Sequence, residues 1–306
     1  ADAVDEVALE PGKELGDGLT TVELSEPVTL AEAQTIASEL AADPRVVSAE
    51  PDQVVTAASF PETPPDDAAF ADRQWNLWDT YGIGAASTPA DMTAAYGRAQ
   101  GEGVRVGVID TGITDHADLA GQLLPGYDFV SNYDTLTAPR EEGGPDVGFD
   151  GDYVDNARYG VDGWDVNPAD PGDWRNVAPV RDSSWHGTNI AGIIGAVADN
   201  EIGIVGVAPK VQVEPIRALS WRGGLLSDVA AAIAWASGGD VPDVPTNEHP
   251  VDVINLSFST QGMCTPALQS VIDAAVERGV TIVAAAGNAN DDVANYAPAN
   301  CNNVIA

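Results

Sequence analysis

The pattern of apolar and polar residues along the second half of the chain predicts strands that alternate with helices. Residues 104–109 form a short run rich in β-branched residues, typical of a strand buried on both faces of a parallel sheet. Further strands are predicted at residues 211–217, 251–258 and 280–286, and helices at residues 89–96, 189–198, 227–237 and 265–278. This alternation predicts an α/β domain whose doubly wound parallel sheet is covered on both faces.

The first 58 residues follow another pattern and predict a separate small α+β unit. A helix is expected at residues 30–40, because Thr29 and Glu32 form a capping-box pair just before an apolar stretch that Pro44 ends. Strands are expected at residues 18–24 and at residues 45–50 together with 53–56. A unit this small is marginally stable by itself, so we expect docking on a larger body to stabilise it.

Residues 59–71 are predicted to be an exposed linker, since prolines and acidic residues interrupt the stretch. Such linkers are natural sites of cleavage. The domain plan is therefore a unit at residues 1–58, a processing linker at 59–71 and a larger unit at 72–306, in which no internal repeat is evident.

Composition narrows the classes of partner. The formal net charge of -35 argues against binding to nucleic acid or to an anionic membrane. No apolar run approaches the roughly 20 residues that a bilayer requires. The chain begins without Met or a signal peptide, and we expect that a targeting segment has been removed. Part of the negative charge is concentrated at residues 141–173, where Arg158 is the single basic residue.

Two residues suggest nucleophilic catalysis. Asp110 ends the predicted strand at residues 104–109 and is followed by a turn glycine, Gly112. The carboxyl ends of such strands are where α/β sheets place their chemistry. His186 opens the predicted helix that follows in the chain. Asp110 alone is equally well explained as a residue that caps a turn. Together, an Asp and a His in this order are two members of a catalytic triad.

Five motifs in order give the chain a family resemblance. They are residues 108–112, 186–192, 203–209, 255–257 and 284–288. The chain resembles the subtilisin-like serine proteases, or subtilases, and most of all the secreted bacterial members, along essentially its whole length. The resemblance implies a subtilisin-like sheet preceded by a ferredoxin-like inhibitory propeptide. It also implies a secreted serine endopeptidase in its zymogen form, a monomer whose propeptide is its own intramolecular inhibitor.

The resemblance gives roles to three residues. His186 would accept the proton of a serine hydroxyl and return it to the leaving amine. Asp110 would hold the imidazole in one tautomer. Asn288, which follows Gly287, would donate its side-chain amide to the oxyanion. The structural alternative for Asn288 is an ordinary loop residue after glycine.

Substrate would bind as an extended peptide along exposed backbone edges. By resemblance, the binding residues are Ser257, Phe258, Ser259, Gly223, Gly224, Ala286 and Gly287. A simple surface turn explains Gly223 and Gly224 nearly as well. The family usually has glycine where Ser259 stands, so we expect a partly narrowed pocket for the primary substrate side chain.

Calcium is the expected cofactor, at two places. Six acidic residues interleaved with glycines offer the hard oxygen ligands that Ca²⁺ prefers: Asp146, Asp150, Asp152, Asp155, Asp162 and Asp165. A solvated acidic loop is the alternative for this segment. A second site follows from resemblance alone and comprises the Asp118 and Asn200 side chains with the carbonyls of Val197, Ile202 and Ile204. Asp118 can equally be a helix cap.

The chain departs from the family at the nucleophile, because the Gly-Thr-Ser motif followed by Met-Ala is absent from residues 1–306. We expect the serine to lie beyond Ala306 and the chain alone to be inactive. The rival hypothesis is an inactive, peptide-binding relative that has lost the serine. Cys264 and Cys301 form either a disulfide or two free buried thiols, and the signs of secretion favour the disulfide.

Overall fold

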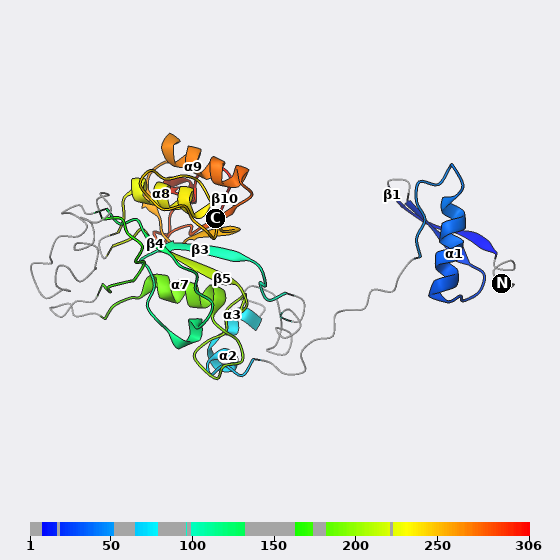
Figure 1. Ribbon diagram of the computed structural model, residues 1–306, viewed down its shortest axis with the longest axis horizontal. Helices are drawn as coiled ribbons and strands as arrows, with labels where there is room; N and C mark the ends of the chain where they lie inside the picture. Colours follow the sequence, from blue (N-terminus) through cyan, green and yellow to red (C-terminus); the bar gives the residue numbers. More distant parts are fainter. Residues whose placement is uncertain are drawn as a thin grey trace, which may run out of the picture. The chain divides into compact units, whose positions relative to one another are not determined.

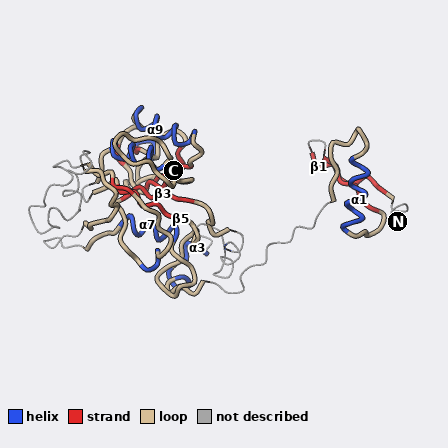
Figure 2. Tube along the Cα trace, in the orientation of Figure 1, coloured by secondary structure: helices blue, strands red, loops and turns tan. Residues whose placement is uncertain are grey.

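The computed structural model describes residues 8–16, 19–51, 65–78, 96, 99–131, 163–173, 182–220 and 223–306. The chain divides into two compact units, Ala1–Ala57 and Ala58–Ala306. Figures 1 and 2 trace the helices and strands of each unit.

The first unit contains an antiparallel hairpin and one helix. Strands β1 (Leu9–Gly16) and β2 (Leu19–Leu24) pair with each other, and helix α1 (Leu30–Ala41) follows. The capping box is formed, because the Thr29 hydroxyl accepts the Glu32 N–H and the Glu32 carboxylate accepts the Thr29 N–H at 2.8 Å. The predictions of β2 and α1 are confirmed.

The pairing partner of β2 precedes it in the chain. Residues 45–50 form turns and irregular backbone, so the strand predicted there is wrong, while residues 53–56 lie outside the described part. Strand β1 was not predicted, because Pro11 and Gly12 are uncommon in strands. Its register with β2 also shifts on both sides of Glu14. These irregularities remove the alternation by which a strand is recognised.

The second unit is built on a six-stranded parallel sheet, which confirms the predicted α/β class. The strand order is β10-β8-β6-β3-β5-β4, and every neighbouring pair is parallel. The strands are β3 (Arg105–Asp110), β4 (Tyr127–Asp128), β5 (Gln212–Arg217), β6 (Val253–Leu256), β8 (Thr281–Ala284) and β10 (Val304–Ile305). The short β7 (Thr260–Gln261) and β9 (Tyr296–Ala297) pair antiparallel outside this sheet. Two-residue strands such as β4 lack a pattern long enough to predict.

Helices cover both faces of the sheet, as Figure 1 shows. Helix α7 (His186–Gly195) packs on β3 and β5 from one side. Helices α8 (Leu226–Ala236) and α9 (Pro266–Glu277) lie together on the other side. The single turns η1 (Ala117–Leu119) and η2 (Val293–Asn295) are 3₁₀ helices. The predicted helices at residues 227–237 and 265–278 are confirmed within one or two residues.

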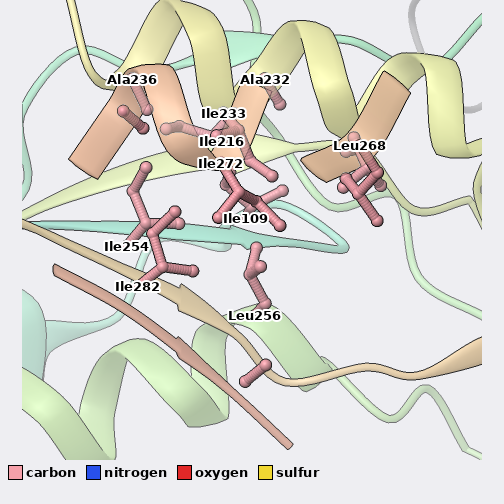
Figure 3. Packing of buried hydrophobic residues seen from close by; sticks show 14 of the residues in the cluster. Ile109, Ile216, Ala232, Ile233, Ala236, Ile254, Leu256, Leu268, Ile272 and Ile282 are labelled. Atoms are coloured by element: carbon pink, nitrogen blue, oxygen red, sulfur yellow. The ribbon is translucent and has the colours of Figure 1, made fainter. Parts of the chain in front are cut away.

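Side chains of strand β3 contribute to two hydrophobic clusters, one on each face of the sheet. Val106 and Val108 belong to the cluster under α7, whereas Ile109 belongs to the cluster under α8 and α9. Figure 3 shows the second cluster, in which isoleucines from neighbouring strands meet the helices. A strand buried on both sides holds the residue at its end rigidly, and that residue is Asp110.

The linker prediction needs a correction at its carboxyl end. Phe70 is 1% exposed, Asp67 is buried, and the Ala69 N–H bonds the Gly203 carbonyl at 2.9 Å. Residues 65–71 are therefore packed into the second unit, with helices α2 (Phe70–Arg73) and α3 (Trp75–Trp78) following. Residues 59–64 lie outside the described part of the chain, as does most of the helix predicted at residues 89–96.

Cys264 and Cys301 form a disulfide with a Cα–Cα distance of 5.1 Å. It joins the residues just before α9 to those just before β10. In the described ranges, no helix is both long enough and apolar enough to span a bilayer.

Candidate active site

The carboxyl ends of four neighbouring strands carry the predicted site. Asp110 ends β3, residues 218–220 and 223–224 follow β5, residues 257–259 follow β6, and residues 285–288 follow β8. Because these strands are parallel neighbours, the segments meet at one edge of the sheet. Residues far apart in the chain are thereby collected in one place.

Asp110 and His186 are in direct contact at this edge. The His186 Nδ1 atom lies 2.7 Å from Asp110 Oδ1, which also accepts the Thr111 N–H at 2.7 Å. Asp110 is fully buried, whereas the His186 side chain is 44% exposed. A buried carboxylate that fixes one imidazole nitrogen leaves the other to exchange protons with a substrate-side group.

The environment of Asp110 acts on its pKa in two directions. Burial raises the pKa of the carboxyl, and the nearby negative charge of Asp170 adds to that rise. The hydrogen bonds from His186 and from the Thr111 N–H lower it, but the net pKa stays above the ordinary aspartate value. Asp110 therefore depends on His186 to keep its charge in the buried site.

Small residues allow helix α7 to start against the end of β3. A Cβ atom at Gly187 would lie 2.2 Å from the Gly112 carbonyl oxygen, so a side chain has no room there. Trp185, just before His186, has left-handed backbone with φ of 48°. Such a conformation is costly for a residue with a side chain and persists where the surroundings enforce it. The turn into α7 is thus built to bring His186 to Asp110.

The residues predicted around the oxyanion come together only in part. Asn288 is exposed on the loop after β8, and Gly287 before it has φ of 94°. The Ser259 hydroxyl lies beside Gly287, 3.1 Å from where a Cβ of that glycine would stand. The loops after β6 and β8 are therefore in contact, with Ala286 exposed between them. The role of Asn288 stays a prediction.

The predicted substrate edges differ in how far their backbone is already paired. The Gly223 N–H and carbonyl both bond Ser220, which closes a tight turn. A Cβ at Gly224 would lie 2.1 Å from the Ala218 carbonyl oxygen, so that backbone is packed closely too. On the other side, the Ser257 hydroxyl accepts the Asn255 amide at 2.9 Å, and Phe258 packs partly on the core.

Comparison with known proteins identifies the family of this chain. The model of the subtilase family matches residues 101–306, which include Asp110, His186 and Asn288. The chain belongs to the subtilase family.

Among subtilases, two curated relatives are similar along most of the chain. An extracellular protease of Xanthomonas campestris pv. campestris is 41% identical over 282 residues, which are 90% of this chain and 43% of the relative. An extracellular basic protease of Dichelobacter nodosus is 36% identical over 302 residues, 95% of this chain and 44% of the relative. The chain thus spans less than half the length of these relatives.

A solved structure of similar sequence supports the same fold. A protease from Pseudoalteromonas arctica has a TM-score of 0.65 and 38% sequence identity, over 79% of this chain and 64% of that one. The subtilisin-like fold of the second unit is therefore shared with a protein of known structure.

The calcium residues named from resemblance lie together. The Asp118 carboxylate accepts the Asn200 side-chain amide at 3.0 Å and the Ile204 N–H at 2.9 Å, while the Asp118 carbonyl accepts the Val197 N–H. The Ile202 N–H bonds the Asn200 side-chain oxygen at 2.8 Å. Here Ile202 and Ile204 contribute N–H groups to the cluster, and the ligand roles of their carbonyls stay predictions.

Sequence reasoning missed a neighbouring group of acids at this place. Asp66, Asp67 and Asp199 each bring a carboxylate oxygen within 4.8 Å of the others. Asp67 is buried, and its Oδ1 atom has no hydrogen-bond partner. Burial raises the pKa of Asp67, and the charge of Asp118 contributes to the rise. These hard, crowded oxygens fit a divalent cation such as Ca²⁺.

Five of the six acids predicted as the other calcium site lie outside the described residues: Asp146, Asp150, Asp152, Asp155 and Asp162. Asp165 is buried, its backbone pairs with Asp128, and its carboxylate accepts the Asn167 N–H at 2.6 Å.

Proposed function

We propose that this chain belongs to a secreted serine endopeptidase that cleaves proteins through an Asp-His-Ser triad. The observation that carries the proposal is the 2.7 Å contact between buried Asp110 and half-exposed His186 at the carboxyl edge of a subtilase sheet. Resemblance to the family implies that the nucleophilic serine follows residue 306, because the Gly-Thr-Ser motif followed by Met-Ala is absent from residues 1–306.

The chemical roles follow from this arrangement. His186 removes the serine proton as the hydroxyl attacks the peptide carbonyl, and then protonates the leaving amine. Asp110 holds the Nδ1–H and stabilises the imidazolium. Asn288 donates its side-chain amide to the oxyanion. An extended peptide lies along residues 257–259 and the Gly224 backbone, which makes proteins and peptides the substrates.

Three further features are part of the proposal. The relatives named extracellular proteases and the Cys264–Cys301 disulfide support secretion. Residues 1–58 are the propeptide and intramolecular inhibitor of a monomeric enzyme. Calcium stabilises the cluster of Asp67, Asp118 and Asn200, where it would neutralise crowded carboxylates.

The test uses the full-length natural protein and a His186→Ala variant. We expect the variant to lose at least about a thousandfold in kcat on a peptide substrate, because neither proton transfer remains. His249→Ala is the matched control, since this histidine lies on a surface loop away from Asp110 and should leave kcat unchanged.

Labelling of the full-length protein with a fluorophosphonate locates the serine. The modified peptide should map beyond residue 306 and should depend on His186. A folded, propeptide-free protein that neither hydrolyses peptides nor takes the label would contradict the proposal and favour an inactive peptide-binding relative.

A further inference from the structure

The hydroxyl of Thr111 connects three segments behind Asp110. It donates to Asp170 Oδ2 at 2.6 Å and accepts the Gly187 N–H at 3.0 Å. A hydroxyl has a single proton to donate, so a Thr111 hydroxyl that donates to Asp170 cannot donate to a second group. The second carboxylate oxygen of Asp110, Oδ2, is buried and has no hydrogen-bond partner. The Thr111 hydroxyl therefore directs its hydrogen bond to Asp170.

Asp170 itself is held firmly in place. Its Oδ1 atom accepts the Gly172 N–H at 2.8 Å, and its own N–H bonds the Ile113 carbonyl at 2.8 Å. The Ile113 N–H returns a bond to the Pro168 carbonyl at 2.9 Å. Residues 168–172 are thus fastened to the chain just after β3, and both oxygens of Asp170 have defined partners.

The same segment also supports the turn that precedes His186. A Cβ at Gly172 would lie 3.0 Å from the Trp185 ring, so this ring packs closely over the segment. Trp185 is the residue with left-handed backbone at the start of α7. Both neighbours of His186 in the chain, Trp185 and Gly187, are therefore held by groups that the segment around Asp170 supports.

We propose that Asp170 is a positioning residue for the Asp110–His186 pair and acts through Thr111. By accepting the hydrogen bond of the Thr111 hydroxyl, Asp170 directs the lone pairs of that oxygen toward the Gly187 N–H. The bond from Gly187 then fixes the first turn of α7 against β3. His186 is carried by that turn, and small errors in its position weaken proton transfer strongly. The inference rests on the proposed function and adds a residue to its machinery.

Two substitutions separate the hydrogen bond from general loop structure. Asp170→Asn keeps an oxygen that can accept from Thr111, whereas Asp170→Ala removes the acceptor. Asn167→Ala is the matched control, because Asn167 lies in the same segment and accepts only the Ala169 N–H among the described contacts. All variants are made in the full-length protein.

We expect Asp170→Ala to lower kcat about ten- to a hundredfold with KM nearly unchanged. Asp170→Asn should recover most of that loss, and Asn167→Ala should match the natural protein. In a Thr111→Val background, Asp170→Ala should cause little further loss, since the group through which it acts is absent. Equal losses for Asp170→Ala and Asn167→Ala, or full additivity with Thr111→Val, would overturn the inference.

A second measurement does not need turnover. The Nδ1 proton between His186 and Asp110 should give a downfield NMR resonance that shifts or broadens in Asp170→Ala and is unchanged in Asn167→Ala. An identical resonance in Asp170→Ala would refute the positioning role even if the natural protein hydrolyses peptides. A natural protein without hydrolysis, but with the expected change in resonance, would refute the proposed function alone.

Discussion

Glu214 is a buried acid in the middle of strand β5. It is fully shielded from solvent and lies on the face of the sheet that Ile216 shares with α8. One carboxylate oxygen accepts the Asn247 side-chain amide at 2.9 Å, and the other has no hydrogen-bond partner. Burial raises the pKa of Glu214 to about 8, although the Asn247 bond and the charge of Arg105 oppose the rise.

This pKa predicts how stability changes with pH. The ordinary glutamate value of 4.5 applies to the unfolded chain, so between pH 4.5 and about 8 the folded protein keeps a proton that the unfolded chain has released. The free energy of unfolding should therefore fall across this window as pH rises, by at most about 1.4 kcal/mol per pH unit from this group. Glu214→Gln cannot titrate and should flatten the dependence, becoming more stable than the natural protein above pH 8.

Chemical denaturation at several pH values between 5 and 9 measures the effect. A His186→Ala background prevents self-digestion under the proposed function. The control is Glu102→Gln, because Glu102 is exposed and pairs with Lys210 on the surface. Parallel curves for Glu214→Gln and the unsubstituted protein would show that Glu214 is ionised in the folded state.

Single residues differ in how far the sequence predicts them. Asp110 and His186 stand in distinctive local patterns, and the structure brings the two side chains into contact. Asp67 and Asp170 act through partners far away in the chain, Asp199 and Thr111. Nothing in the residues around them distinguishes them from the many exposed acids of the chain, so only the fold reveals their contacts.

At the level of elements, three segments meet at the proposed calcium cluster. Asp118 lies on η1, Asn200 on the loop after α7, and Asp67 just before α2. Gly203 has φ of 48° and approaches Asp118 so closely that a Cβ would lie 2.4 Å from its carboxylate. Phe70 on α2 and Val205 on the loop after α7 pack in one small apolar cluster, and a cation that neutralises the carboxylates would add a further link between these elements.

Removal of calcium should therefore loosen these elements before the sheet. We expect chelation to lower the melting temperature, and the loss is about 2.7 kcal/mol if the free ion was at a hundred times its dissociation constant. Asp67→Asn should weaken the response to calcium, because it removes the charge of a buried carboxylate. Asp240→Asn, on an exposed loop, should respond to calcium as the natural protein does. A melting temperature that is independent of calcium would contradict the site.

Elements were predictable where a single pattern ran long enough. The helix at α1 was found from its capping box, and the central strands from their β-branched runs. Strand β1 was missed because proline and glycine break its alternation. The strand predicted at residues 45–50 shows the opposite error. A pair of β-branched residues does not form a strand unless a neighbouring strand is there to pair with it.

For the whole molecule, the two units differ greatly in the size of their cores. Among the described residues of the first unit, Ile36 and Ala37 are the buried apolar side chains, whereas Leu9 and Val22 stay exposed on the hairpin. The second unit has buried clusters on both faces of its sheet. The alternation of strands and helices was enough to predict the larger fold, because a parallel sheet needs helical crossovers.

The small core of the first unit leads to a prediction about the excised segment. Residues 1–57, made as a separate peptide, should be poorly folded alone, because so little apolar surface is buried. Under the proposed function, the peptide should gain helical circular dichroism when mixed with the mature enzyme and should inhibit hydrolysis in a concentration-dependent way. Folding on binding reduces affinity by the free energy needed to order the peptide.

A variant that weakens the segment makes the prediction sharper. Thr29→Ala removes the hydroxyl that caps α1 and should cost about 1 kcal/mol of helix stability, which raises the inhibition constant roughly fivefold. Thr35→Ala is the control, because the Thr35 hydroxyl only bonds the Ala31 carbonyl within the helix. Inhibition that is equally strong for both variants would mean that α1 is not ordered on binding. An enzyme indifferent to residues 1–57 would show that this unit is not its inhibitor.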